Sequence, residues 1–158
     1  MKSTNLPWSA PALAMLSLLL LACTPLIASY NADAYKNATT LKAETGALIE
    51  KSGEPFAQNK PAVETLTTRI NAAYEYAAGL PSNRISAQQW QILRNPSGGL
   101  YGEFVARWRE QGTTSRAYRA AKKQQLDRAF DFIICLEANK QESRPCSAPP
   151  AQAGAGAD

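Results

Sequence analysis

Apolar residues recur along the middle of the chain at the spacing of one face of an α-helix. Proline is favoured in the first turn of a helix, and glycine and proline commonly follow its end. Between Asn59-Lys60-Pro61 and Gly79-Leu80-Pro81, the apolar positions fall at intervals of three and four residues: Val63, Leu66, Ile70, Ala73, Tyr74 and Ala77. The pattern therefore predicts a long helix that follows Pro61 and closes at Gly79.

Four further helices are expected from similar patterns. A seven-residue recurrence of Ile27, Ala34, Leu41 and Leu48 predicts a helix over residues 28–50. Ser86 and Gln89 have the spacing of a capping box and predict a short helix that continues through Leu93. The last two predicted helices are a short one over Leu100–Glu110 and a long one from about Ser115 to Lys140.

Because no segment shows the alternation of a strand, we expect an all-α fold. Residues 28–143 are predicted to form a bundle of three long helices and a hairpin of two short ones. The aromatic residues of the short helices are expected to fill the core, although they could instead line a ligand pocket: Trp90, Tyr101, Phe104 and Trp108. Residues 144–158, rich in Pro, Ala and Gly, are predicted to be a disordered tail.

The N-terminus carries a short apolar run of a different kind. Ala12–Ala22 is almost entirely apolar and follows a polar head that contains Lys2. The run is about half of the roughly 20 residues that a membrane-spanning helix needs. A basic head, a short apolar stretch and a small residue before a cleavage point describe a secretory signal.

The residue after that small residue is Cys23. Leu20-Leu21-Ala22-Cys23 resembles the lipobox of bacterial lipoprotein precursors. The resemblance implies that residues 1–22 are removed, that Cys23 is acylated, and that residues 23–27 form a short tether to a membrane. Thr24, where an aspartate could stand, implies sorting to the outer membrane, with the domain facing the periplasm. Ordinary signal cleavage or an uncleaved anchor are the alternatives.

The other two cysteines are expected to pair. At about 100° per residue, Cys135 lies roughly opposite the core-facing Leu126 on the last helix, beside polar side chains. An exposed thiol is reactive in an oxidising compartment, where disulfides persist. A chain reversal at Arg144-Pro145 would bring Cys146 back to Cys135, so we predict a Cys135–Cys146 disulfide. Free or intermolecular thiols are the competing interpretation.

Composition removes several classes of chemistry. The chain has no histidine, the commonest metal ligand and the commonest general base near neutral pH. A Ser-His-Asp or Cys-His centre is therefore excluded within one chain, and no metal or cofactor is expected. Glu103 and Glu110 lie seven residues apart and could support glycoside cleavage, but no further signature accompanies them.

Positive charge gathers in the second half of the chain. On the last predicted helix, the cations of the early turns lie on the same face as the apolar residues of the later turns. Cations near a helix N-terminus also oppose the helix dipole. A bound anion would relieve both problems. The candidate anion-binding residues are Arg107, Arg109, Arg116, Arg119, Lys122 and Lys123. The plain alternative is a solvated basic face at the end of the bundle.

Together these patterns predict a non-catalytic, lipid-anchored helical protein that binds another envelope component, most simply a protein. The alternative is a module that binds anionic lipid, lipopolysaccharide or glycan through the basic residues. An anchored periplasmic position argues against a nucleic-acid partner. An enzyme is the third hypothesis, and it would need a cleft with perturbed carboxylates.

Overall fold

A computed structural model describes residues 28–142 and Cys146. The predicted signal peptide (residues 1–22) and the whole of the predicted tether (residues 23–27) lie outside these residues, and so does the predicted tail apart from Cys146. The described part is helical and contains no strand, which confirms the predicted all-α class. Its five helices are α2 (Ala32–Lys51), α3 (Phe56–Gly79), α4 (Arg84–Arg94), α5 (Tyr101–Gln111) and α6 (Arg116–Glu142).

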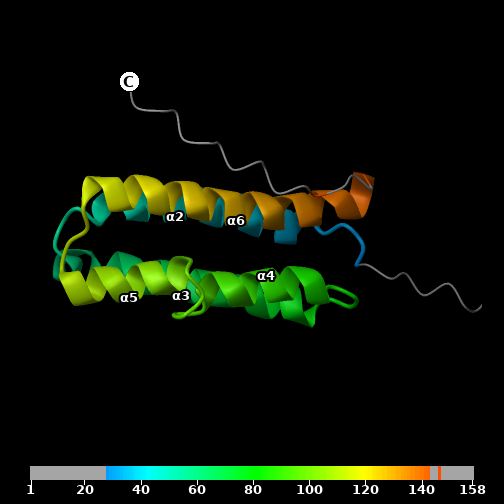
Figure 1. Cartoon of the computed structure of the whole chain (residues 1–158). Helices are drawn as coiled ribbons and strands as arrows, with labels where there is room; N and C mark the ends of the chain where they lie inside the picture. The colour runs from blue at the N-terminus through cyan, green and yellow to red at the C-terminus, as the bar shows by residue number, and fades with distance from the viewer. Residues whose placement is uncertain (1–27, 143–145, 147–158) are drawn as a thin grey trace, which may run out of the picture.

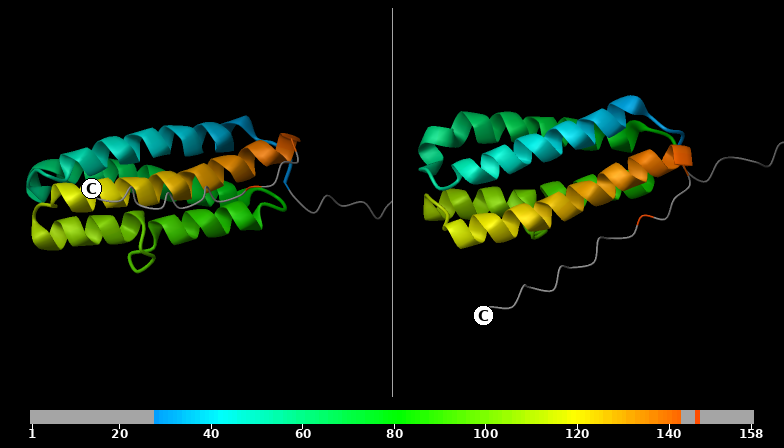
Figure 2. Two further views of the ribbon diagram at one scale, coloured as in Figure 1. Left: turned by 45° about the horizontal axis from the view of Figure 1, so that its top comes forward. Right: turned by 90° about the horizontal axis from the view of Figure 1, so that it is seen from above.

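The helices form an antiparallel bundle with four sides. Helices α2 and α6 lie side by side in one layer, and α3 lies beside α4 and α5 in the other (Figure 1). The chain runs along α2, returns along α3, runs again along α4 and α5, and returns along α6 (Figure 2). The "terminal end" of the bundle therefore holds residues 28–31, the 80–83 turn and the end of α6. The "loop end" holds the turns at 52–55 and 112–115.

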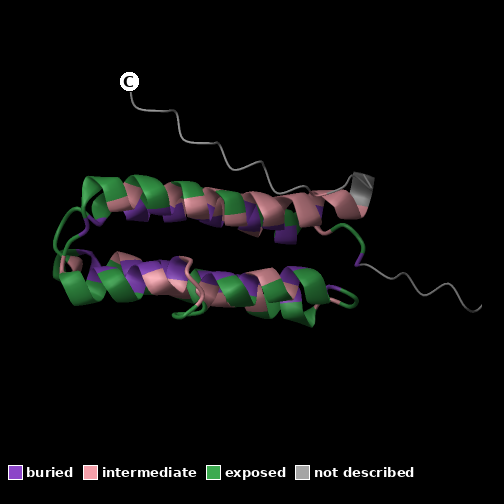
Figure 3. Ribbon diagram, viewed as in Figure 1, coloured by how far each residue is buried: buried purple, intermediate pink, exposed green. Residues whose placement is uncertain are grey.

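The core lies between the two layers, where each helix presents its apolar stripe (Figure 3). Trp90 and Phe130 meet edge to face with ring centroids 5.9 Å apart, which is a favoured aromatic geometry. Phe104 and Trp108 are completely buried. The four aromatic residues of the short helices are thus core residues, as the apolar spacing predicts.

Tyr101 brings one polar group into this core. Its hydroxyl lies 2.9 Å from that of Thr67 and also contacts the carbonyl of Val63. Burial raises the pKa of the Tyr101 phenol to about 12, although the hydrogen bond with Thr67 lowers it in part. Folding therefore favours the neutral, protonated phenol of Tyr101 over the phenolate.

This pKa predicts an alkaline loss of stability. An unfolded tyrosine has a pKa near 10, so the contribution of Tyr101 is complete below about pH 10 and is lost between about pH 10 and pH 12. In that window the free energy of unfolding should fall by an extra ~1.4 kcal/mol per pH unit. Urea unfolding at several alkaline pH values should show a shallower decline for Tyr101→Phe, whereas Tyr35→Phe, at an exposed position, should keep the parent slope. Equal slopes for all three proteins would contradict the assignment.

Helices α2 and α3 begin at different residues from those predicted. Helix α2 begins at Ala32, not Ala28, because Asn31 is its N-cap and accepts a hydrogen bond from the Ala34 amide at 2.9 Å. Helix α3 begins at Phe56, ahead of Asn59, because the Phe56 amide donates to the Gly112 carbonyl at 2.8 Å. Pro61 lies inside α3 and removes one helical hydrogen bond at an exposed position.

The capping box predicted at Ser86 and Gln89 is also wrong. Helix α4 begins at Arg84, its N-cap is Asn83, and Ser86 is buried within the first turn. The chain leaves α3 through Ser82, whose φ of 57° lies in the left-handed region. After that turn, helical hydrogen bonding begins ahead of Ser86, since the Ala87 amide donates to the Asn83 carbonyl. A box spacing alone does not show which residue is the N-cap, and Asn83 takes that position without a capping hydrogen bond from its side chain.

The two short helices do not form the predicted hairpin. Helices α4 and α5 follow one another along one side of the bundle, and residues 95–100 leave that side as a loop (Figures 1 and 2). The ends of this loop come together, because a Cβ atom on Gly102 would lie 2.3 Å from the Arg94 carbonyl oxygen. The third side of the bundle is thus one helical path interrupted by a loop.

Candidate functional site at the two ends of the bundle

The predicted disulfide is present near the terminal end. Cys135, on α6, is bonded to Cys146, with their Cα atoms 5.7 Å apart. The bond holds Cys146 beside α6, as the position of Cys135 on the polar face of that helix suggests. Cys23 lies outside the described residues, so its predicted acylation stays a prediction.

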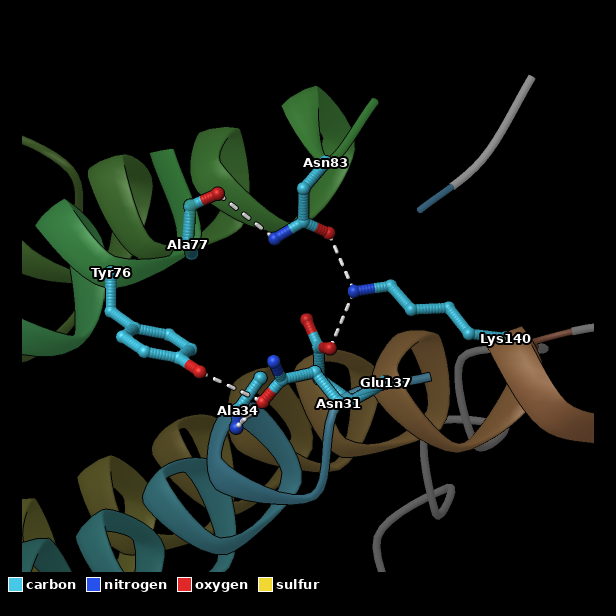
Figure 4. Close-up of polar contacts among 7 residues, drawn as sticks. All are labelled: Asn31, Ala34, Tyr76, Ala77, Asn83, Glu137 and Lys140. Atoms are coloured by element: carbon cyan, nitrogen blue, oxygen red, sulfur yellow. Dashed lines mark hydrogen bonds and ion pairs between the residues drawn. The ribbon is translucent and has the colours of Figure 1, made fainter. Parts of the chain in front are cut away.

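Beside the disulfide, α6 carries a buried ion pair that the sequence analysis missed. The Lys140 ammonium donates to Glu137 and also to the Asn83 side-chain carbonyl, each at 2.5 Å (Figure 4). Glu137 is 1% exposed, and its second carboxylate oxygen has no hydrogen-bond partner among the described residues. Asn83 donates onward to the Ala77 carbonyl at 2.9 Å. The cluster ties the end of α6 to the turn between α3 and α4.

A signal for this pair does exist in the sequence. Glu137 is eleven positions after Leu126, so it falls on the same apolar stripe of the helix. A charged residue on a core stripe needs a partner, and Lys140 lies three positions later.

The chain enters the bundle at the same end. The Ala28 amide donates to the Ser82 carbonyl at 3.2 Å, in the turn that also carries Asn83. The Tyr76 hydroxyl donates to the Asn31 side chain at 3.0 Å, which joins the last turn of α3 to the cap of α2 (Figure 4). The first described residues are thus fixed to the bundle rather than extending from it.

The structure does not bring the six predicted anion-binding residues together as one free patch. Lys122 is buried and donates to Glu103 at 2.7 Å, to the Gly99 carbonyl at 2.8 Å and to Gln125 at 2.9 Å. Lys123 pairs with Asp127 at 2.8 Å. Both lysines have internal partners, and Lys122 also holds the 95–100 loop against α6. Periodicity placed Lys122 on the face where the structure buries it, but it could not show the carboxylate that Lys122 meets.

Arg119 is also engaged, in the closure of the loop end. Its guanidinium donates to the Thr114 carbonyl at 2.6 Å and lies so close to Gly53 that a Cβ atom there would meet it at 2.8 Å. The hydroxyls of Thr114 and Ser52 lie 2.6 Å apart, and the Thr114 amide donates to the Ser52 carbonyl. Arg119 therefore helps to join the two turns of this end.

The other three predicted cations, Arg107, Arg109 and Arg116, are exposed at the loop end, and we call them the loop-end arginines. Among the described residues, none of the three takes part in an ion pair. The Arg107 guanidinium lies 4.5 Å from the centre of the Tyr118 ring, and that of Arg109 lies 5.4 Å from the Phe56 ring. These contacts orient the two charges while leaving them in water.

Tyr118 contributes to this surface as a neutral ring. Burial raises the pKa of its phenol, the charge of Glu103 raises it further, and Arg107 lowers it. The phenol therefore keeps its proton at neutral pH, so the ring offers its face to Arg107 without a phenolate charge.

No protein-family model, curated protein or solved structure matches this chain. Within residues 28–142 and Cys146, no group of three or more acidic, cysteine or histidine side chains is placed to hold a metal ion. None of the described helices combines the length and apolar character needed to span a membrane.

Proposed function

We propose that this protein is a non-catalytic, lipid-anchored component of the bacterial envelope that binds a protein partner through its loop-end arginines. The anchor is the acylated Cys23, placed in the outer membrane with the bundle in the periplasm. The observation that carries the proposal is the position of three exposed arginines, none of them in an ion pair with another described residue, at the end of the bundle opposite Ala28.

Simple lengths support this arrangement. Four residues separate Cys23 from Ala28. The five steps from Cys23 to Ala28 therefore span at most ~18 Å, at ~3.5 Å per step. Helix α6 has 27 residues, and at ~1.5 Å per residue it is ~40 Å long. An anchor at Cys23 thus holds the terminal end close to the membrane, and an upright bundle presents Arg107, Arg109 and Arg116 far from it.

Arginine is enriched at protein interfaces and forms two parallel hydrogen bonds with a carboxylate. Arg107 and Arg109 are already oriented by aromatic rings, which reduces the entropy lost when they bind. We therefore propose an acidic surface on another envelope protein as the ligand of this end.

A module for anionic lipid, lipopolysaccharide or glycan is the second candidate. The observation that favours it is the same set of exposed guanidinium groups, because phosphate also accepts two hydrogen bonds from arginine. This alternative requires the bundle to lie along its own membrane, or to meet a second anionic surface.

Charge reversal separates the two candidates. The triple variant Arg107→Glu, Arg109→Glu, Arg116→Glu should lose crosslinks to a specific envelope protein, detected by mass spectrometry after crosslinking in intact cells. A matched control, Lys36→Glu, Arg84→Glu, Arg128→Glu, changes three exposed positions away from the loop end by the same total charge and should keep them. Circular dichroism should show equal helicity in both variants.

Binding to anionic vesicles and to lipopolysaccharide is measured in parallel. Loss of this binding in the loop-end variant, with all protein crosslinks retained, would favour the second candidate. Unchanged crosslinks together with unchanged vesicle and lipopolysaccharide binding would contradict both.

A further inference from the structure

The terminal end carries exposed aromatic and aliphatic side chains that the core does not use. Tyr30, Tyr35 and Tyr76 are 36–39% exposed, and Ile85 is 53% exposed. They belong to the segment before α2, the first turn of α2, the last turn of α3 and the first turn of α4. Three of the four sides of the bundle therefore present a large apolar group at this one end.

All three tyrosines have a contact within this end. The rings of Tyr30 and Tyr35 lie 6.5 Å apart. The Tyr76 hydroxyl donates to the Asn31 side chain (Figure 4). A tyrosine has an apolar ring and a polar hydroxyl, and this combination is enriched where a protein meets the interface between membrane and water.

The length of the preceding chain limits what can cover this surface. Because the Ala28 amide is bonded to the 80–83 turn, the tether cannot lengthen without breaking that contact. With an acyl chain on Cys23, Ala28 stays within ~18 Å of that anchor, at ~3.5 Å for each of the five steps between the two residues. The polar headgroup region of a bilayer is itself ~5–8 Å deep on each side.

We propose that Tyr30, Tyr35, Tyr76 and Ile85 form a membrane seat, which enters the interface of the bilayer that holds the acyl chains. This inference rests on the proposed acylation of Cys23. The seat gives the bundle one orientation, so the loop end points away from the membrane instead of sampling all directions on a short tether.

Charge plays little part in the seat. The exposed charged residues near these side chains include both signs, Asp33 and Glu75 against Lys36 and Arg84. The surface therefore needs apolar and interfacial contact rather than anionic headgroups. Vesicles of zwitterionic phospholipid are the appropriate probe.

The test uses the full acylated protein, confirmed by mass and reconstituted into such vesicles. With Cys23 acylated and Cys135 bonded to Cys146, a single introduced cysteine is the only free thiol. An environment-sensitive fluorophore is attached through Arg84→Cys at the terminal end or through Thr113→Cys at the loop end. The label at position 84 should be quenched by brominated lipid and shielded severalfold from a water-soluble quencher. The label at position 113 should remain accessible.

A seat variant and a matched control complete the design. Tyr30→Ser, Tyr35→Ser, Ile85→Ser should make position 84 as accessible as position 113, whereas Ile92→Ser, at another exposed isoleucine of α4, should leave the shielding intact. Equal accessibility at 84 and 113 in the parent acylated protein would overturn the seat while the anchor stands. A chain that carries no acyl mass would overturn the anchor and the seat together.

Discussion

Replacing Lys140 with methionine is expected to lower the free energy of unfolding by about 3–5 kcal/mol. Lys140 is the ion-pair partner of Glu137, a carboxylate that is almost completely buried. One carboxylate oxygen of Glu137 already has no hydrogen-bond partner among the described residues. Without the Lys140 ammonium group, the other oxygen also loses its partner. The same change removes the donor to Asn83, so the turn between α3 and α4 loses its link to α6.

Urea unfolding at neutral pH measures this loss, and Lys42→Met is the matched control. Lys42 also pairs across the bundle, with Asp131, but the two side chains are 30% and 46% exposed. An exposed pair contributes no more than about 1 kcal/mol. The double variant Glu137→Leu, Lys140→Met should recover much of the lost stability, because an apolar pair leaves no buried charge. A loss for Lys140→Met no larger than that for Lys42→Met would contradict the role of the cluster.

Replacing Gly102 with alanine is the second large effect that we expect. The added Cβ would lie 2.3 Å from the Arg94 carbonyl oxygen and 2.6 Å from the backbone of Asn95. Backbone atoms cannot move aside as a flexible side chain can, so α5 would have to shift away from α4. Tyr101 and Phe104 are buried on the same helix and would move with it. Overpacking of this kind costs about 1–3 kcal/mol, and the rigid obstacle places Gly102→Ala at the upper part of that range.

Gly79→Ala is the control for this prediction. Gly79 also lies in a helix, but a Cβ atom there meets nothing within 4 Å. Alanine costs less conformational entropy than glycine in a helix, so this variant should be neutral or more stable by up to about 1 kcal/mol. Thermal unfolding followed by circular dichroism compares the two. Equal midpoints would show that α4 and α5 do not meet as closely as described.

Local patterns in the sequence predicted much of this fold. The apolar stripe of α3 and the aromatic positions of α5 depend on spacing within one helix, and the structure places both in the core. The Cys135–Cys146 bond was also predictable from the sequence. It depends only on the helix face that carries Cys135 and on the short separation between the two cysteines.

Features that depend on contacts between helices were not predictable in the same way. The in-line arrangement of α4 and α5 depends on how closely Gly102 approaches Arg94. The role of Lys122 depends on Glu103, nineteen residues away on another helix. Spacing placed Lys122 on the same helix face as the later apolar stripe. Its partner Glu103 lies on another helix, and only the packing of the helices brings the two together. Three of the six predicted anion-binding residues remain as candidates for that reason.

The central claim is the attachment of fatty acids to Cys23, since the anchor, the orientation of the bundle and the seat all follow from it. The most direct measurement is the intact mass of the protein extracted from its native envelope, compared with that of Cys23→Ser. We expect a chain that begins at Cys23 and carries added acyl mass, and a serine variant that lacks this modification. A native chain with the mass of its unmodified amino acids would contradict the account.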